Sequence, residues 1–226
     1  MSNDDATAAA LRGLGPLGLA AILIILLAGN ISVNKLPVIP AGGILVLVWT
    51  WRSRTPWREI GYARPDSWVR AVIVGVLFGA ALKIVMKTIV MPLLGAPPVN
   101  QAYQFLIGNN DLLPAAVWAM FVAGFSEETV YRGFLFERLQ KLFGWTTVAR
   151  IGIVLVTSLW FAVVHYPGQG LPGVEQAAVV GLVFGGIFAR TRSVWMLMCA
   201  HTAFDLTALV LIYWNIERDV AQLIFK

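Results

Sequence analysis

The chain has 226 residues, of which 58% are apolar or aromatic (AVILMFWYC) and 13% are charged. Soluble domains hold about 45–50% apolar and about 25% charged residues, so this composition excludes an ordinary soluble domain, and the low charge also excludes a disordered chain. A single cysteine excludes a disulfide scaffold. We therefore expect one membrane-embedded domain over residues 1–226, and its fold class is predicted to be all-α, a polytopic bundle of transmembrane helices.

Apolar stretches predict about seven membrane spans, with six or eight as alternatives, because a span needs about 20 apolar residues. In chain order the spans are expected at residues 13–34, 36–51, 71–94, from 112 onward, 151–166, 176–189 and 194–214. The third span carries Lys83 and Lys87. The favoured interpretation is that both lysines snorkel toward the far membrane surface, and the alternative is that they bind a carboxylate of a substrate.

Basic residues predict how the spans are oriented. The chain has 17 Lys and Arg against 12 Asp and Glu. Three alternate connections hold most of them, namely Arg52, Arg54, Arg58, Arg64 and Arg70, then Arg132, Arg138, Lys141 and Arg150, then Arg190 and Arg192. The opposite connections hold Lys35 and little else that is basic. By the positive-inside rule we expect a cytoplasmic N-terminus in a bacterial or archaeal plasma membrane, with the lipid bilayer as partner and no nucleic acid.

The fourth span ends in a charged cluster at residues 126–132, with the sequence SEETVYR. Glu128 and Arg132 are four residues apart, the spacing of a helical ion pair, whereas Glu127 points about 100° away from Glu128 on an ideal helix. One carboxylate is then neutralised while the other faces elsewhere. The alternative is a patch at the membrane surface that water simply solvates.

Both histidines of the chain fall in predicted spans, where ionisable groups are costly and indicate function. His165 follows Phe161 by four residues, and His201 precedes Asp205 by four, so each pair shares one helix face. The alternatives are a histidine satisfied at a helix end for His165, and a structural hydrogen bond between helices for His201.

Together these groups suit the activation of water against a carbonyl. A carboxylate in a low-dielectric site can act as general base, a histidine can carry a second proton, and a polar pair can stabilise an oxyanion. The same ligand types would also accept zinc, although H-E-x-x-H is absent. The absence of G-x-S-x-G and of a P-loop removes support for a serine hydrolase or a P-loop ATPase.

At these residues the sequence resembles the CPBP family, which comprises CAAX prenyl proteases, bacteriocin-processing enzymes and Abi proteins. The family motifs E-E-x-x-x-R, F-x-x-x-H and H-x-x-x-N/D correspond here to Glu127-Glu128-x3-Arg132, Phe161-x3-His165 and His201-x3-Asp205. The three motifs occur in the family order and use both histidines. The resemblance covers residues 112–213, which we expect to form the catalytic core.

The resemblance implies an intramembrane endopeptidase that hydrolyses a peptide bond of a membrane-associated peptide or protein tail. By position, Glu127 and His165 would activate the water, and His201 and Asp205 would form the oxyanion side of the site. Aspartate replaces the asparagine of many members, and an ionised Asp205 would orient His201 rather than donate a hydrogen bond.

The remaining matched residues, Glu128, Arg132 and Phe161, would support the site. A glutamate-dependent mechanism without a cofactor is favoured, with zinc as an alternative. Two other functions stay open at this point. One is a non-catalytic Abi-type immunity or scaffold protein, and the other is a proton-coupled transporter that uses the same ionisable groups.

Overall fold

The computed structural model describes residues 2–28 and 40–225, and these residues form helices and no strand. The α-helices are α1 (Asn3–Arg12), α2 (Pro16–Ala28), α3 (Ala41–Arg52), α4 (Trp68–Val85), α5 (Met91–Leu93), α6 (Leu113–Glu127), α7 (Phe136–Phe143), α8 (Thr147–Val163), α9 (Tyr166–Thr191), α10 (Trp195–Tyr213) and α11 (Glu217–Ala221). Two π-helical segments, η2 (Met86–Val90) and η4 (Glu128–Leu135), and two 3-10 helices, η1 (Trp57–Ile60) and η3 (Gln101–Leu106), complete the list. The expected all-α fold class is confirmed.

Three helical stretches in the described part are long and apolar enough to cross a membrane, namely Trp68–Leu93, Tyr166–Thr191 and Trp195–Tyr213. The bent pair α1–α2 makes a fourth if its two helices, which meet at 59°, count as one span. The other predicted spans correspond to the shorter helices α3, α6 and α8. Within the predicted spans 13–34 and 36–51, residues 29–34 and 36–39 lie outside the described residues, as does Lys35.

The boundary between the fifth and sixth spans was predicted wrongly. Helix α8 runs over Thr147–Val163 instead of 151–166, and the predicted sixth span 176–189 is only the second part of α9, which begins at Tyr166. Pro167 lies in the first turn of α9, where a missing N–H costs nothing. Gly170, with φ +64°, then bends the helix just before Pro172. The Tyr-Pro-Gly sequence after His165 therefore starts a helix instead of forming a connection.

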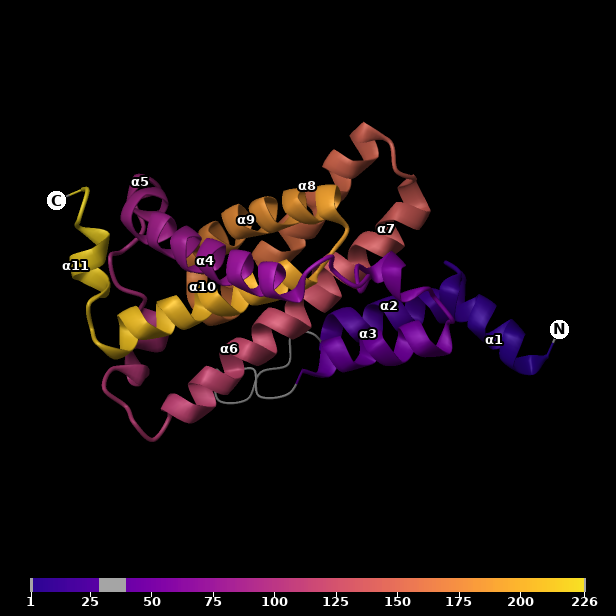
Figure 1. Ribbon diagram of the computed structural model, residues 1–226, viewed down its shortest axis with the longest axis horizontal. Helices are drawn as coiled ribbons and strands as arrows, with labels where there is room; N and C mark the ends of the chain where they lie inside the picture. Colours follow the sequence, from indigo (N-terminus) through magenta and orange to yellow (C-terminus); the bar gives the residue numbers. More distant parts are fainter. Residues whose placement is uncertain (1, 29–39, 226) are drawn as a thin grey trace.

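Helix α10 is the centre of the bundle and packs against both α4 and α6 (Figure 1). Glycines make the close approach possible. A Cβ atom on Gly79 of α4 would lie 1.9 Å from the carbonyl oxygen of Ala200, and one on Gly124 of α6 would lie 2.2 Å from Oγ1 of Thr202. These contacts hold the faces of α4 and α6 against the part of α10 that carries His201.

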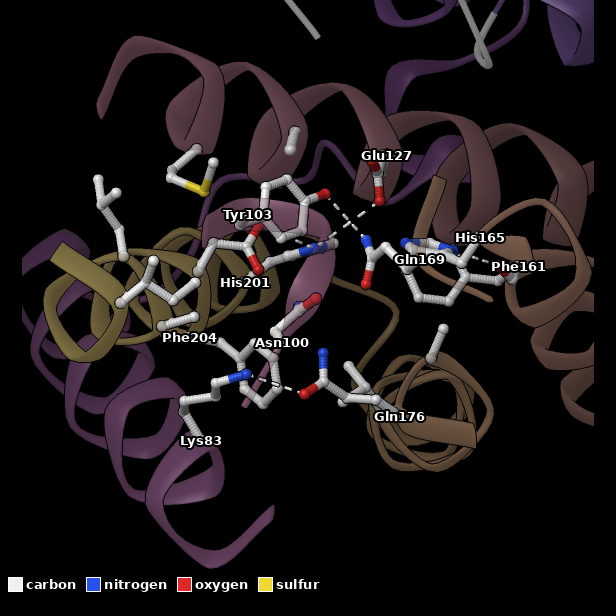
Figure 2. A pocket seen from close by; sticks show the side chains of 18 of the residues that line it. Lys83, Asn100, Tyr103, Glu127, Phe161, His165, Gln169, Gln176, His201 and Phe204 are labelled. Carbon is white, nitrogen blue, oxygen red and sulfur yellow. Dashed lines mark hydrogen bonds and ion pairs between the residues drawn. The ribbon is translucent and has the colours of Figure 1, made fainter. Parts of the chain in front are cut away.

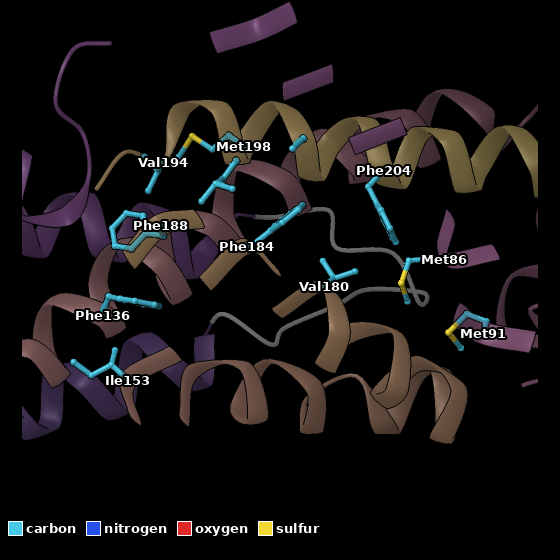
Figure 3. Close-up of a cluster of buried hydrophobic side chains, with 12 residues drawn as sticks. Met86, Met91, Phe136, Ile153, Val180, Phe184, Phe188, Val194, Met198 and Phe204 are labelled. Carbon is cyan, nitrogen blue, oxygen red and sulfur yellow. The ribbon is translucent and has the colours of Figure 1, made fainter. Parts of the chain in front are cut away.

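A cluster of buried apolar side chains from η2, α5, α7, α8, α9 and α10 fills the space beside α10 (Figure 3). Phe184 and Phe188 of α9 are fully buried in it together with Phe136 of α7 and Leu197 and Met198 of α10. The edge-to-face contact of Phe136 with Phe188, at 4.9 Å between ring centroids, is a favourable aromatic geometry. This cluster fixes the position of α9 relative to α10.

The three predicted basic connections meet at one end of the bundle. Nζ of Lys141 lies 3.7 Å from a carboxylate oxygen of Glu59, and the backbone N–H of Val194 donates to the carbonyl of Gly61. The opposite end holds η3 and α11. However, Arg132 and Arg138 are buried, and Arg138 pairs with Glu137, so these two arginines are not surface charges as the loop assignment implied.

Candidate active site

The acidic pair lies where the helix that starts at Leu113 changes its winding. Glu127 is the last residue of α6 and Glu128 is the first residue of the π-helical segment η4, which continues directly into α7. π-Helical segments are rare and often occur at functional sites. The change of winding occurs at the point where two adjacent carboxylates enter the interior of the bundle.

Glu128 joins two cationic or ionisable partners in a buried network. Its Oε1 atom lies 2.8 Å from Nη1 of Arg132 and 2.8 Å from Nδ1 of His201. Glu128 and Arg132 are 0% and 1% exposed. The structure thus contains the ion pair that the i,i+4 spacing indicated, and it adds a bond to α10 that the local spacing could not indicate.

His201 lies between three carboxylates. Its Nε2 atom is 3.7 Å from Oε2 of Glu127 and 3.5 Å from Oδ2 of Asp205, while Nδ1 faces Glu128. Because the carboxylate of Glu128 is paired with Arg132, it accepts, and Nδ1 of His201 donates. The two adjacent glutamates therefore contact opposite edges of one imidazole ring.

His165 lies at the junction of α8 and α9, where it is the residue before the first turn of α9. Its Nδ1 atom is 2.6 Å from the carbonyl oxygen of Phe161. A carbonyl only accepts, so Nδ1 carries the proton and Nε2 of the neutral ring is an acceptor. No hydrogen bond joins His165 to Glu127 among the described residues, although both side chains line one cavity.

Phe161 contacts three of the candidate site residues at once. Its ring centroid lies 4.6 Å from that of His165, 6.0 Å from that of His201 and 4.6 Å from the guanidinium carbon of Arg132. The ring is 2% exposed. The aromatic residue of the second motif thus separates the two histidines and covers the buried cation.

A cavity of about 120 Å³ lies between α4, α6, α9, α10 and η3 (Figure 2). Glu127, His165, His201 and Asp205 all line it, although they come from three separate stretches of the chain. A second cavity of about 220 Å³ adjoins it, and the two share the lining residues Lys83, Asn100, Gln169, Gln176 and Ile212. The site has room for water beside the carboxylates and for part of a peptide.

Several polar residues of the cavity were not predicted from the sequence. Tyr103 comes from η3, and its hydroxyl oxygen accepts a hydrogen bond of 3.1 Å from Nε2 of Gln169 (Figure 2). Burial raises the pKa of Tyr103 to about 12, and the carboxylates of Asp205 and Glu127 add to the effect, so the hydroxyl keeps its proton at neutral pH. The one available signal was the pair Gln169 and Gln176, two amides seven residues apart in an apolar stretch.

The prediction that Lys83 and Lys87 snorkel toward the membrane surface is wrong. Both residues are buried, at 7% and 8% exposure, and both point into the bundle. Nζ of Lys83 donates to Oε1 of Gln176 at 2.8 Å, and Nζ of Lys87 pairs with Glu217 at 2.6 Å. The partners lie on α9 and α11. The local sequence around the two lysines does not indicate that these helices pack beside them.

The described residues contain no group of three or more His, Cys, Asp or Glu side chains that is arranged to hold a metal ion. We derive no step of the chemistry through a metal.

Comparison with known proteins gives a family match for part of the chain. Residues 109–207 match the family model described as type II CAAX prenyl endopeptidase Rce1-like. A search of curated proteins and a search of solved structures found no match. The matched segment contains all three motifs and is similar to the Rce1-like family, which agrees with the resemblance of the sequence to the CAAX prenyl proteases.

Proposed function

With this similarity of residues 109–207 as premise, we propose that the cavity hydrolyses a peptide bond of a membrane-associated peptide or protein tail, without a metal. The main support for this proposal is that one cavity inside the helical bundle is lined by Glu127, His165, His201 and Asp205. Acid–base catalysis needs groups that touch the same reacting atoms, and a shared cavity supplies that condition.

Glu127 is the proposed general base. Its Oε2 atom is buried and has no hydrogen-bond partner among the described residues, so it is available to accept a proton from water. The neighbouring Glu128 is occupied by Arg132 and His201 and cannot take this role. Nε2 of neutral His165 is the second acceptor that would orient the same water.

The oxyanion side is assigned to His201. Water oxygen attacks the carbonyl carbon while Glu127 takes the proton of the water, and charge develops on the carbonyl oxygen. When His201 is protonated, its Nε2–H donates to that oxygen, and the carboxylate of Asp205 at 3.5 Å favours this charged form. Collapse of the intermediate breaks the C–N bond, and Glu127 returns the proton to the leaving amine.

Glu128, Arg132 and Phe161 are proposed as positioning residues. The bond from Nδ1 of His201 to Glu128 fixes the orientation of the ring, and the bond from Arg132 holds the carboxylate of Glu128 in place. The ring of Phe161 holds both histidines at a set separation. With a cytoplasmic N-terminus, the site would lie toward the cytoplasmic half of the membrane, since the basic connections form the nearer end of α10.

The substrate class is a peptide or protein that is held at the membrane, either by a lipid group or by its own apolar tail. A prenylated CAAX end, a secreted peptide precursor and a sorting-tagged protein share this property. The cavity supports the class because its lining combines the polar groups above with apolar side chains such as Leu106, Met120 and Phe204.

The test is cleavage by the purified full chain in lipid vesicles, with a library of acylated peptides bearing apolar tails and mass spectrometry of the products. We expect cleavage by the wild type, and its loss in His165→Ala and His201→Ala. Glu175→Gln is the matched control, because Glu175 lies on α9 and does not line the cavity. A non-catalytic immunity or scaffold protein would release no product above background.

A chelator arm addresses the mechanism. Activity that survives prolonged incubation with a strong chelator supports the glutamate-dependent mechanism. Loss of activity that returns when zinc is added would instead establish a metalloprotease.

A further inference from the structure

Lys83 of α4 is a buried cation that contacts no carboxylate of the described residues. Its Nζ atom donates to Oε1 of Gln176 at 2.8 Å and lies 4.7 Å from the ring centroid of Phe204 (Figure 2). Lys83 forms no ion pair with any described carboxylate. A buried ammonium is normally paired, because removing a charge from water without compensation is costly. The two neutral contacts of Lys83 leave part of that cost uncompensated.

Lys87, one turn further along the same helix, shows the usual solution. It forms an ion pair with Oε1 of Glu217 at 2.6 Å, and Oε2 of Glu217 accepts from the backbone N–H of Asn100. The acids that attract Lys83 electrostatically are Asp205 and Glu217, but neither contacts it, and Lys87 repels it. The fold thus satisfies one of two neighbouring lysines and leaves the other able to receive an anion.

The position of Lys83 indicates where that anion would come from. Lys83 lines the cavity that holds Glu127 and also lines the adjoining cavity, so it lies where the two meet. Leu106 and Phe204 provide apolar walls beside it. A peptide that reaches from Glu127 into the second cavity would pass Lys83, and the anion that every unmodified peptide carries is its terminal carboxylate.

We propose that Lys83 binds the C-terminal α-carboxylate of the substrate and so sets the distance of the cleaved bond from the C-terminus. This inference rests on the proposed function, since it specifies the substrate of the same site. Gln176 holds the ammonium in place until the carboxylate arrives. Lys83 is then a specificity-determining residue that touches substrate at a point away from the reacting bond.

The test compares three acylated apolar peptides in lipid vesicles. The first lacks Asp and Glu and ends in a free carboxylate, the second is its C-terminal amide, and the third is an amide with aspartate as its last residue. For the wild type we expect kcat/KM to be about 10- to 100-fold higher for the free acid than for the amide, the worth of a hydrogen bond to a charged group. The change should lie mainly in KM.

The variants assign the preference to one residue. Lys83→Met should cleave acid and amide at equal rates, and Lys83→Arg should retain the preference because it keeps the cation. The matched control is the double variant Lys87→Met with Glu217→Gln, which removes the neighbouring pair without leaving a buried charge and should keep the preference. Binding of the same peptides to Glu127→Gln is measured in parallel, because binding needs no turnover.

Each outcome decides between the two proposals. A wild type that cleaves acid and amide equally, or a Lys83→Met variant that keeps the preference, overturns the role of Lys83 and leaves the endopeptidase intact. A preference for the aspartyl amide over the plain amide that equals the preference for the free acid overturns the assignment to the terminal carboxylate. Selective binding of the free acid that depends on Lys83, without cleavage of any peptide, supports the anion site and contradicts the endopeptidase.

Discussion

Replacing Arg132 with methionine removes the cation from the buried network that holds His201. The side chain of Arg132 is 1% exposed and donates to Oε1 of Glu128 at 2.8 Å, so Arg132→Met leaves an uncompensated carboxylate in the interior. Breaking a buried pair by removing one partner costs about 3–5 kcal/mol. This cost includes the lost cation–π contact of Arg132 with the ring of Phe161, because methionine fills the space of the side chain but carries no charge.

A second substitution separates the charge effect from the packing effect. In the double variant Glu128→Gln with Arg132→Met, the side chain at position 128 is neutral. Its amide oxygen can still accept a hydrogen bond from Nδ1 of His201. We expect the double variant to recover about 2–3 kcal/mol of the loss, since the unpaired buried charge is gone. The two substitutions should therefore be strongly non-additive.

The measurement is equilibrium unfolding of the purified chain in mixed detergent micelles, followed by the fluorescence of its nine tryptophans. The free energy of unfolding is compared for the wild type, the two single variants and the double variant. A loss below about 1 kcal/mol in Arg132→Met, or additive effects of the two substitutions, would show that the pair is solvated and would refute its buried supporting role.

Three further predictions concern the packing, the cavity and the second lysine. Gly79→Val should destabilise the fold by about 3 kcal/mol or prevent its accumulation in the membrane, because a Cβ atom there would meet the carbonyl of Ala200 at 1.9 Å; quantifying folded protein after detergent extraction checks this, and normal levels would contradict it. Tyr103→Phe should lower kcat about tenfold without changing the unfolding curve, since the hydroxyl is a protonated donor in the cavity at neutral pH. An unchanged kcat would show that the hydroxyl takes no part in catalysis. Glu217→Gln should lower the free energy of unfolding by about 3–5 kcal/mol, because it leaves Lys87 buried and unpaired. The same unfolding assay measures this loss, and an unchanged unfolding curve would contradict the prediction.

The local part of the site could be predicted from the sequence because it depends on spacing within one helix. The i,i+4 pairs Glu128–Arg132 and His201–Asp205 are neighbours on any helix, and both are present in the structure. The apolar stretches likewise follow from composition, so the helical membrane bundle needed no tertiary information. These features hold whatever the helices pack against.

The contacts between helices could not be predicted in this way. The 100° separation of Glu127 from Glu128 indicated that they face different surroundings, yet both reach His201 because its ring lies between them and the helix changes to π-winding at Glu128. The register that brings α10 to this point depends on Gly124 and Thr202, which meet side to side. Spacing in one segment holds no information about such a register.

The cavity lining also depends on tertiary structure. Tyr103 lies in a 3-10 helix whose position is fixed by contacts with α9 and α10, and nothing in its neighbours signals a role. The sequence favoured snorkelling for Lys83, because the aliphatic part of a lysine side chain can lie along lipid. Only the packing of α4 against α10 shows that this side chain faces inward. The boundary after His165 was missed because Pro and Gly begin a helix there.

The most direct test of the central claim is the turnover number of Glu127→Gln in lipid vesicles, measured with a peptide that the wild type cleaves. Loss of a general base is expected to lower kcat by about 100- to 10,000-fold, while the unfolding curve stays that of the wild type. A Glu127→Gln variant with kcat within tenfold of the wild type would contradict the assignment of water activation to this carboxylate.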